Sequence, residues 1–225
     1  MNPIFEDFHS RAKNLFASAN SKNGLHYDGQ FVTGRLYVPD TLFVGINPGF
    51  AGGQQSVTTG AFVAHPCKYI GESYLMARRI KDVVMGGNEA ALSLCAETSY
   101  RSFLATSNVA ELSRILAAQD QDWRKKHHAL MQDWQKAMIE TIKPKRIICL
   151  GIGNQGPFHD MLRTFRIDRN NGVERQLSEA SSTGKTEPVF YKRATISGIP
   201  IHGIIHLSGA QPSALMLERL SKELS

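Results

Sequence analysis

The chain has 225 residues, of which 42% are hydrophobic and 20% are charged, and its formal net charge is +6 at pH 7. This length and composition predict one globular domain over residues 1–225 and exclude a disordered chain, because there are enough apolar side chains to form a core. No apolar run is long enough to span a bilayer and the N-terminal segment lacks the pattern of a signal peptide, so we expect a cytoplasmic protein.

Hydrophobic periodicity in the first half of the chain predicts two helices and two strands. A loop rich in Gly, Ser and Thr at 48–66 separates them, and a loop of this length in a compact domain is more often functional than idle. Gly86 and Gly87 are expected to end the second helix. The predicted helices span 3–19 and 72–85, and the predicted strands span 42–46 and 102–108.

The second half alternates between helix and strand patterns. The predicted helices span 123–142, 158–165 and 212–224, and the predicted strands span 146–150, 189–196 and 199–205. Ser197 and Gly198 are expected to form a tight hairpin turn, Pro212 to lie in the first turn of the last helix, and 166–188 to be an exposed loop. The alternation predicts a three-layer α/β/α fold with a largely parallel central sheet.

Two of the predicted strands end in a polar side chain next to a turn. The first runs into Gly45-Ile46-Asn47-Pro48-Gly49, and the second, near the C-terminus, runs into His206-Leu207-Ser208-Gly209. In open parallel α/β sheets, ligands bind outside the carboxyl ends of the strands, so these segments predict one shared pocket. An asparagine does not titrate, but its amide orients a water molecule through the carbonyl oxygen and donates through the nitrogen.

Each of these residues also has a purely structural interpretation. Asn47 caps local backbone in many strand-ending turns, and a lone histidine such as His206 is often a hydrogen-bonded structural residue. Asn108, at the end of the predicted strand 102–108, has the same two interpretations, because asparagine commonly forms a local turn with its own backbone. The sequence leaves these alternatives open.

The GINPG segment resembles the first motif of the uracil-DNA glycosylase superfamily, and is closest to its mismatch-specific (thymine-DNA glycosylase-like) and single-strand-selective branches. The segment TGAFVAHP at 59–66 is similar to a loop of the mismatch-specific branch, and HLSG at 206–209 resembles the last motif. Leu207 replaces the usual proline of that motif, and Val63 stands where a stacking aromatic residue is expected. The ordered matches extend over about residues 40–224.

The resemblance implies a uracil-DNA glycosylase-like fold and hydrolysis of the N-glycosidic bond of uracil, or of a related damaged pyrimidine, in base excision repair. It implies that Asn47 positions the attacking water, His206 stabilises the departing base, Phe62 stacks on the base and Asn108 reads its edge. The expected partner is DNA with the damaged base flipped into the pocket. The other residues expected at the substrate are Gly45, Ile46, Pro48, Gly49, Ser208 and Gly209.

We expect a monomer that needs no cofactor and does not bind membranes, nucleoid-associated if the source is bacterial. The three cysteines are odd in number and widely spaced, which indicates neither a disulfide framework nor a metal site. The run Lys125-Lys126-His127-His128 is expected to face solvent on its helix, and its adjacent histidines make a poor metal pair.

One other motif competes with this interpretation. The segment Gly151–Gly156 matches G-x-G-x-x-G between a predicted strand and a predicted helix, which is the context of a dinucleotide-binding turn. Pro157 follows at once, and the acidic candidates Asp168 and Glu174 lie in a polar segment, so a simple strand-to-helix turn is favoured. The alternatives are therefore a nucleotide-cofactor enzyme and a non-catalytic nucleic-acid-binding relative of the same fold.

Overall fold

A seven-stranded mixed sheet dominates the part of the chain that the computed structural model describes, with the strand order β2-β4-β3-β6-β9-β8-β7. The described residues are 3–19, 26–27, 32–46, 66–102, 104–106, 109–154, 156–168, 172–178, 189–207 and 212–225. The strands of this sheet are β2 (Val32–Gly34), β3 (Thr41–Gly45), β4 (Cys95–Ser99), β6 (Ile147–Leu150), β7 (Arg175–Ser178), β8 (Val189–Ile196) and β9 (Ile199–Ile204).

The centre of the sheet is parallel and its edges are antiparallel. Strands β4, β3, β6 and β9 run in the same direction, whereas β2, β8 and β7 each run against their neighbours. The largely parallel sheet expected from the sequence is therefore a mixed sheet with a parallel core. A separate two-stranded sheet pairs β1 (His26–Tyr27) with β5 (Leu104–Ala105).

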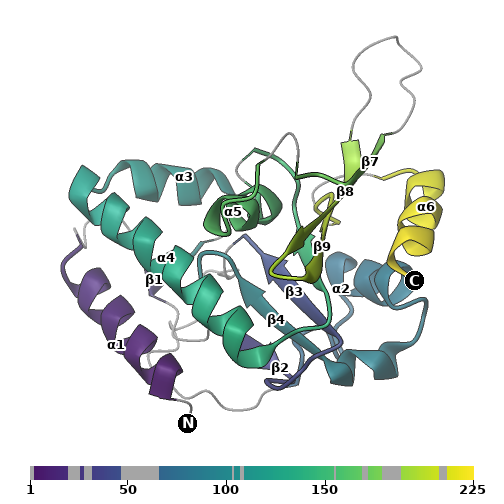
Figure 1. Ribbon diagram of the computed structural model, residues 1–225, viewed down its shortest axis with the longest axis horizontal. Helices are drawn as coiled ribbons and strands as arrows, with labels where there is room; N and C mark the ends of the chain where they lie inside the picture. Colours follow the sequence, from purple (N-terminus) through teal and green to yellow (C-terminus); the bar gives the residue numbers. More distant parts are fainter. Residues whose placement is uncertain are drawn as a thin grey trace.

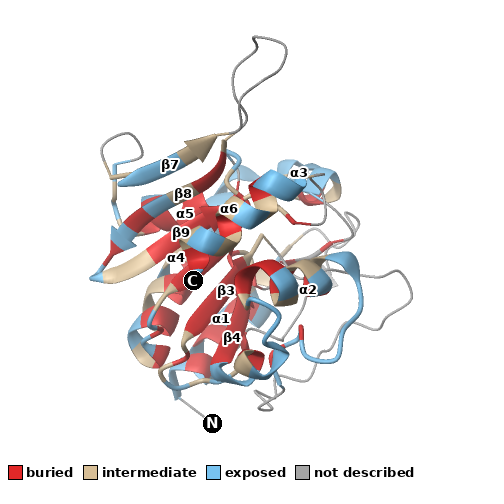
Figure 2. Ribbon diagram, turned by 90° about the vertical axis from the view of Figure 1, so that its right-hand side faces the viewer, coloured by how far each residue is buried: buried red, intermediate tan, exposed pale blue. Residues whose placement is uncertain are grey.

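Helices cover both faces of the seven-stranded sheet (Figure 1). One face is covered by α1, α4 and α5, and the other by α2, η2 and α6. The helical elements are α1 (Pro3–Ala17), α2 (Leu75–Arg79), the π-helix η2 (Ile80–Val84), the 3₁₀-helix η3 (Glu89–Leu94), α3 (Val109–Ala117), α4 (Gln121–Ile142), α5 (Pro157–Thr164) and α6 (Ala214–Leu224). Figure 2 shows that the buried residues concentrate on the central strands and on the helix faces turned toward them.

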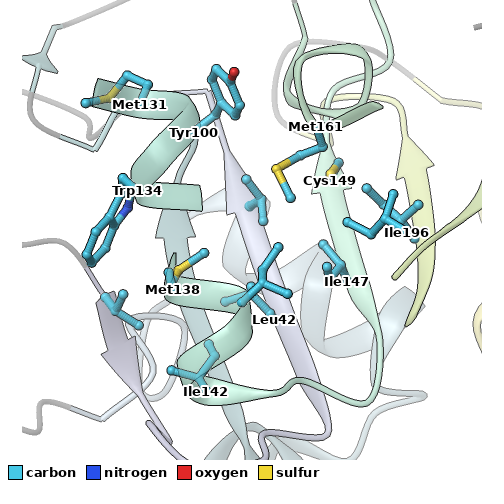
Figure 3. Packing of buried hydrophobic residues seen from close by; sticks show 14 of the residues in the cluster. Leu42, Tyr100, Met131, Trp134, Met138, Ile142, Ile147, Cys149, Met161 and Ile196 are labelled. Atoms are coloured by element: carbon cyan, nitrogen blue, oxygen red, sulfur yellow. The ribbon is translucent and has the colours of Figure 1, made fainter. Parts of the chain in front are cut away.

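The central strands are buried on both faces, so they read as continuous apolar runs. Along β3, the side chains of Leu42 and Val44 join the core under α4, while Phe43 joins the core on the opposite face. Strand β6 repeats this alternation with Ile147 and Cys149 on the α4 side. Figure 3 shows Leu42, Ile147 and Cys149 facing the row Met131, Trp134, Met138 and Ile142 of α4.

Several predicted elements are confirmed to within two residues at each end. They are the helices at 3–19, 123–142 and 158–165 and the strands at 42–46, 146–150, 189–196 and 199–205. Ser197 and Gly198 form the turn between β8 and β9, and both have positive φ (48° and 78°), the geometry of a type I′ hairpin. The predicted helix 72–85 begins at Leu75 and ends as η2, and Gly86 and Gly87 follow it with positive φ.

Of the strand predicted at 102–108, only Leu104–Ala105 is confirmed, as β5, and residues 103, 107 and 108 lie outside the described residues. Residues 101 and 102 form a turn, and the two-residue strand β5 pairs with β1 rather than with β3. The parallel neighbours of β3 are β6 and β4, and the sequence did not reveal β4 because the polar residues Glu97, Thr98 and Ser99 occupy buried positions in it. Glu97 is tolerated there because Lys68 forms an ion pair with its carboxylate.

Three smaller differences follow from local chemistry. The segment expected to be a loop at 166–188 contains β7, which pairs with β8. Helix α3 was not predicted. Helix α6 begins after Ser213, whose hydroxyl caps the Met216 amide at 3.1 Å, so Pro212 lies before the helix and not in its first turn.

Candidate functional site

The carboxyl ends of the four parallel strands lie along one edge of the sheet. After β3 the chain adds β4 on one side of it and then β6 on the other, so the strand order reverses between β3 and β6. In open α/β sheets this reversal is the usual position of a ligand-binding crevice. The site is therefore expected beyond Gly45, Leu150 and Ile204, the last residues of β3, β6 and β9.

The end of β3 is held by the turn that follows β4. The Gly45 carbonyl accepts a hydrogen bond from the Tyr100 amide at 2.8 Å, and the Ile46 carbonyl accepts one from the Arg101 amide at 2.9 Å. Ile46 packs against a small apolar cluster formed by Leu104, Leu112 and Ile115. These contacts fix the backbone up to the residue before Asn47.

Seven of the predicted site residues lie outside the described residues, and their positions stay predictions. They are Asn47, Pro48, Gly49, Phe62, Asn108, Ser208 and Gly209. The structure places the other three, Gly45, Ile46 and His206, at the same edge of the sheet. Since β6 lies between β3 and β9, the distance between β3 and β9 is about 10 Å.

His206 is partly buried two residues beyond the end of β9. Burial lowers its pKa below the usual histidine value, so the imidazole is neutral at pH 7. The backbone on both sides is anchored, because the Ile205 amide donates to the Phe190 carbonyl at 3.1 Å and the Leu207 carbonyl accepts from the Arg79 guanidinium. A neutral histidine on a fixed backbone suits hydrogen bonding to a group that becomes negatively charged.

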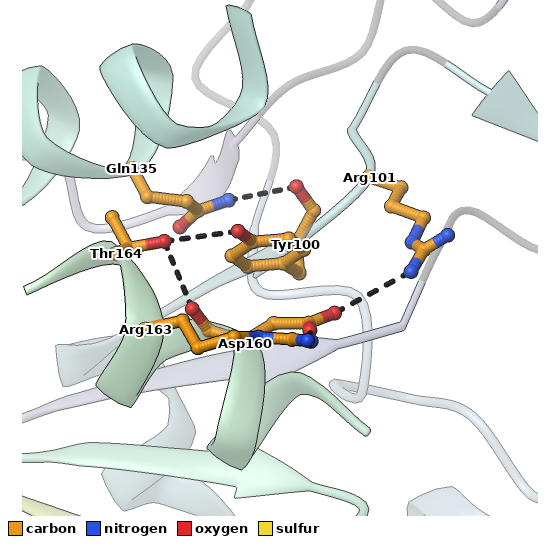
Figure 4. Close-up of polar contacts among 6 residues, drawn as sticks. All are labelled: Tyr100, Arg101, Gln135, Asp160, Arg163 and Thr164. Carbon is orange, nitrogen blue, oxygen red and sulfur yellow. Dashed lines mark hydrogen bonds and ion pairs between the residues drawn. The ribbon is translucent and has the colours of Figure 1, made fainter. Parts of the chain in front are cut away.

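The turn after β4 lies beside the end of β3, where the sequence analysis expected the end of the 102–108 strand. Helix α4 holds this turn, since Gln135 donates to the carbonyls of Ser99 (3.0 Å) and Tyr100 (3.1 Å), and Trp134 donates to the Ser102 hydroxyl (3.0 Å). The Tyr100 hydroxyl bonds to that of Thr164 at 2.9 Å (Figure 4). No strand of the 102–108 segment pairs with β3, and the turn after β4 places Tyr100 and Arg101 beside the end of β3; Asn47 and Asn108 themselves lie outside the described residues.

The Gly151–Gly156 segment forms a tight turn between β6 and α5. A Cβ on Gly156 would lie 2.7 Å from the Gly151 carbonyl oxygen, which explains the glycine. The Gly156 amide donates to the Gly153 carbonyl at 2.7 Å, and the Phe158 amide donates to the Gly151 carbonyl at 3.3 Å. Both amides donate to carbonyl groups of the turn itself. In a dinucleotide site, backbone amides of this turn donate to the pyrophosphate instead.

The two acidic residues considered for the dinucleotide-binding motif also lie away from the position that the motif requires, the carboxyl end of a strand. Asp168 and Glu174 are exposed, and neither lies at the carboxyl end of a strand. Glu174 pairs with Arg193 at 3.6 Å, beside the edge strands. The simple strand-to-helix turn is the interpretation that these contacts favour.

The cysteines show no sign of a reactive or metal-bound thiol. All three are buried and free, and burial raises the pKa of Cys67 to about 12 and that of Cys95 to about 11. Within the ranges that the structure describes, no group of three or more His, Cys, Asp or Glu side chains lies together as a metal site. None of the described helices is both long and apolar enough to cross a membrane.

Comparison with known proteins adds no family assignment. No protein-family model matches the chain, and no curated protein shows significant sequence similarity to it.

Proposed function

We propose that the protein is a DNA glycosylase with a uracil-DNA glycosylase-like three-layer fold, which hydrolyses the N-glycosidic bond of uracil or a related damaged pyrimidine. The observation that carries the proposal is the position of Gly45 and Ile46. They lead directly into Asn47-Pro48-Gly49 at the point where the strand order of the sheet reverses. His206 stands at the same edge, two strands away.

The chemistry needs two groups on opposite sides of the bond that breaks. Water adds to the sugar C1′, the bond to the base nitrogen breaks, and its electron pair leaves with the base. The proton that the water loses passes to solvent, and the base anion takes up a proton from solvent, so the products are the C1′ hydroxyl and the neutral base. In this proposal the Asn47 carbonyl orients the water, and the neutral His206 ring donates a hydrogen bond to the base as negative charge develops on it. The hydrogen bond strengthens only as the charge grows, so it favours the transition state over the bound substrate.

Two further residues, Phe62 and Asn108, are proposed to recognise the base. Phe62 would stack on the flipped base, and the Asn108 amide would pair with its polar edge. Asn108 no longer has a strand beside β3 to place it there, because that position belongs to β4. In this proposal Phe62 stacks on the base, and a side chain of the 99–108 segment pairs with its polar edge.

The test is excision of uracil from single-stranded and double-stranded oligonucleotides, with abasic sites as the product measured. Asn47→Ala is expected to remove most of the activity while the fold is retained, because the variant loses the group that positions water. Asn154→Ala is the matched control, since Asn154 is an exposed asparagine in the turn after β6 at the same edge. Wild-type excision by a folded Asn47→Ala protein would contradict the proposal.

Two parallel measurements separate the alternatives. Saturable binding of NAD or ATP, lost on mutation of the Gly151–Gly156 turn, would favour a nucleotide-cofactor enzyme. Oligonucleotide binding by the wild-type protein without any excision would favour a non-catalytic nucleic-acid-binding relative of the same fold.

A further inference from the structure

A pocket of 210 Å³ lies next to the candidate site, between the turn after β4 and helices α3, α4 and α5. Its position follows from the Arg101 amide, which bonds to Ile46, the residue before Asn47. Most of its polar lining is basic. The ionisable side chains that line it are Arg101, Arg124, His127, His128, Asp160 and Arg163, with the buried Tyr100 beside them.

The charges in this pocket do not balance. Asp160 is its sole carboxylate among the described residues, and it is shared between Arg101 at 3.5 Å and Arg163 (Figure 4). Arg124 is exposed and has no ion-pair partner within the described ranges. Three guanidinium groups therefore face one carboxylate, which leaves an excess of positive charge in a concave space.

Part of this positive charge is held away from water. The Arg101 side chain is 21% exposed, and burial lowers its pKa, which shows that the charged form is destabilised there. Such a desolvated cation is stabilised by a partner charge, and the Asp160 carboxylate that pairs with Arg101 at 3.5 Å also pairs with Arg163. An anion in the pocket would add a second partner for Arg101.

Hydrogen bonds and a ring stack hold the aromatic walls of the pocket. The Tyr100 hydroxyl is bonded to Thr164, and Gln135 holds the Tyr100 carbonyl at 3.1 Å. His127 stacks on Trp123, with ring centroids 5.0 Å apart and planes at 8°. Arg101 is the least exposed of the three arginines, whereas Arg124 is exposed and the Arg163 side chain is 44% exposed, so an oxyanion would cost side-chain entropy mainly at Arg124 and Arg163.

We propose that this pocket binds one phosphate group. Arginine forks match phosphate oxygens with paired hydrogen bonds, and the pocket offers Arg124 together with the outer faces of Arg101 and Arg163. If the proposed glycosylase function holds, the phosphate belongs to the DNA backbone beside the flipped nucleotide. A free phosphate or a nucleoside monophosphate has the same chemistry, so the experiment includes both sources.

The test compares Arg124→Gln and Arg124→Glu with Lys125→Gln as the matched control. Lys125 is exposed on the same helix and does not line the pocket. Binding of a fluorescent single-stranded oligonucleotide is measured by anisotropy at several salt concentrations. Binding of inorganic phosphate and of deoxyuridine 5′-monophosphate is measured by calorimetry.

Arg124→Gln is expected to weaken oligonucleotide binding about tenfold and to reduce the slope of log affinity against log salt by about 0.7, the loss of one phosphate contact to a single strand. Arg124→Glu is expected to weaken it further, and Lys125→Gln to stay within about twofold of wild type. Loss of phosphate and nucleotide binding alone, with oligonucleotide binding intact, would keep the site and assign it a free phosphate ligand.

Wild-type binding of all three ligands by Arg124→Gln would overturn the proposal, and so would an equal loss in Lys125→Gln, which indicates diffuse attraction. The excision assay separates this result from the proposed function. An Arg124 effect on oligonucleotide binding in a protein that excises no uracil would leave the phosphate site standing without the glycosylase. Uracil excision together with wild-type oligonucleotide binding by Arg124→Gln would support the glycosylase and overturn the phosphate site.

Discussion

His127 and His202 are two of the three buried histidines among the described residues, and burial favours the neutral form of both. His127 lies between Trp123 and Phe16, and its Nε2 atom has no hydrogen-bond partner within the described residues. His202 on β9 bonds through Nδ1 to the Tyr191 hydroxyl at 2.9 Å. Burial is the main cause that lowers the pKa of His127 to about 3 and that of His202 to about 4.

These values predict that the protein loses stability below about pH 6.5. Between that pH and the folded pKa values, the unfolded chain binds a proton at each histidine that the folded chain does not, so the free energy of unfolding rises with pH. The loss is about 1.4 kcal/mol per histidine for each pH unit below 6.5, and stability from this source is complete above it. Urea unfolding at pH 7, 6 and 5 measures it.

The variant His127→Phe isolates one of the two contributions. Phenylalanine keeps an aromatic ring beside Trp123 and removes the unpaired nitrogen, so we expect little change at pH 7. Its free energy of unfolding should then fall less steeply as the pH is lowered, by about 1.4 kcal/mol per pH unit less than that of the wild type. Parallel curves for the two proteins would show that His127 does not titrate in this way.

At the scale of elements, the packing of α5 on β9 controls the edge of the sheet that carries His206. Gly203 lies in β9 directly beneath α5, and a Cβ there would lie 2.6 Å from Phe158 Cγ and 2.7 Å from Ile152 Cγ2. The ring of Phe158 is fully buried and has no room to retreat. The glycine at this position therefore serves the close approach of the helix to the strand.

We predict that Gly203→Ala destabilises the fold by about 1–3 kcal/mol, the usual cost of overpacking a well-packed core. Because α5 or β9 must shift, the activity assigned to His206 should fall as well. Chemical denaturation gives the first quantity and the excision assay the second.

Gly153→Ala is the control for this prediction. A Cβ on Gly153, in the turn between β6 and α5, meets nothing within 4 Å. The control should match or slightly exceed wild-type stability, because alanine restricts the unfolded chain. An unfolding midpoint for Gly203→Ala equal to that of Gly153→Ala would refute the packing argument.

For the whole molecule, the net charge of +6 and the basic pocket predict a strong dependence of DNA binding on salt. Each phosphate that the protein neutralises releases counterions from the DNA, so log affinity should fall linearly with log salt between about 50 and 200 mM. The slope on double-stranded DNA should be about 0.9 per phosphate contact and that on single strands about 0.7. A flat plot for both substrates would contradict phosphate contacts.

Local patterns were enough to predict the elements that frame the candidate site. Strands β3 and β6 are buried on both faces and read as apolar runs, and α4 shows helical periodicity with a capping Asp120 that accepts from Trp123 at 2.7 Å. The residue pair Ser197-Gly198 likewise predicted the hairpin turn between β8 and β9. In each case neighbouring residues in the sequence supply the interactions that decide the structure.

Strand β4 could not be predicted in this way, because its stability depends on partners far along the chain. Glu97 would interrupt a buried strand without Lys68, and the Thr98 hydroxyl bonds to that of Ser102 at 3.2 Å inside the turn. The 102–108 segment has the more apolar local pattern, so pattern alone favoured the wrong strand. For this reason the sequence predicted that Asn108 lies beside Asn47. It did not predict that Tyr100 and Arg101 lie beside the end of β3.

The sequence by itself determined three of the four parallel strands (β3, β6 and β9), the long helix and the segments with Asn47 and His206 after strands, since side-chain periodicity and turn chemistry act between near neighbours. The tertiary structure alone decided the strand order, which brings the ends of β3 and β9 to one edge. It also decided the basic pocket, because Arg101, Arg124 and Arg163 lie on three elements. Packing of buried apolar faces brings these elements together, and no local pattern records which faces meet.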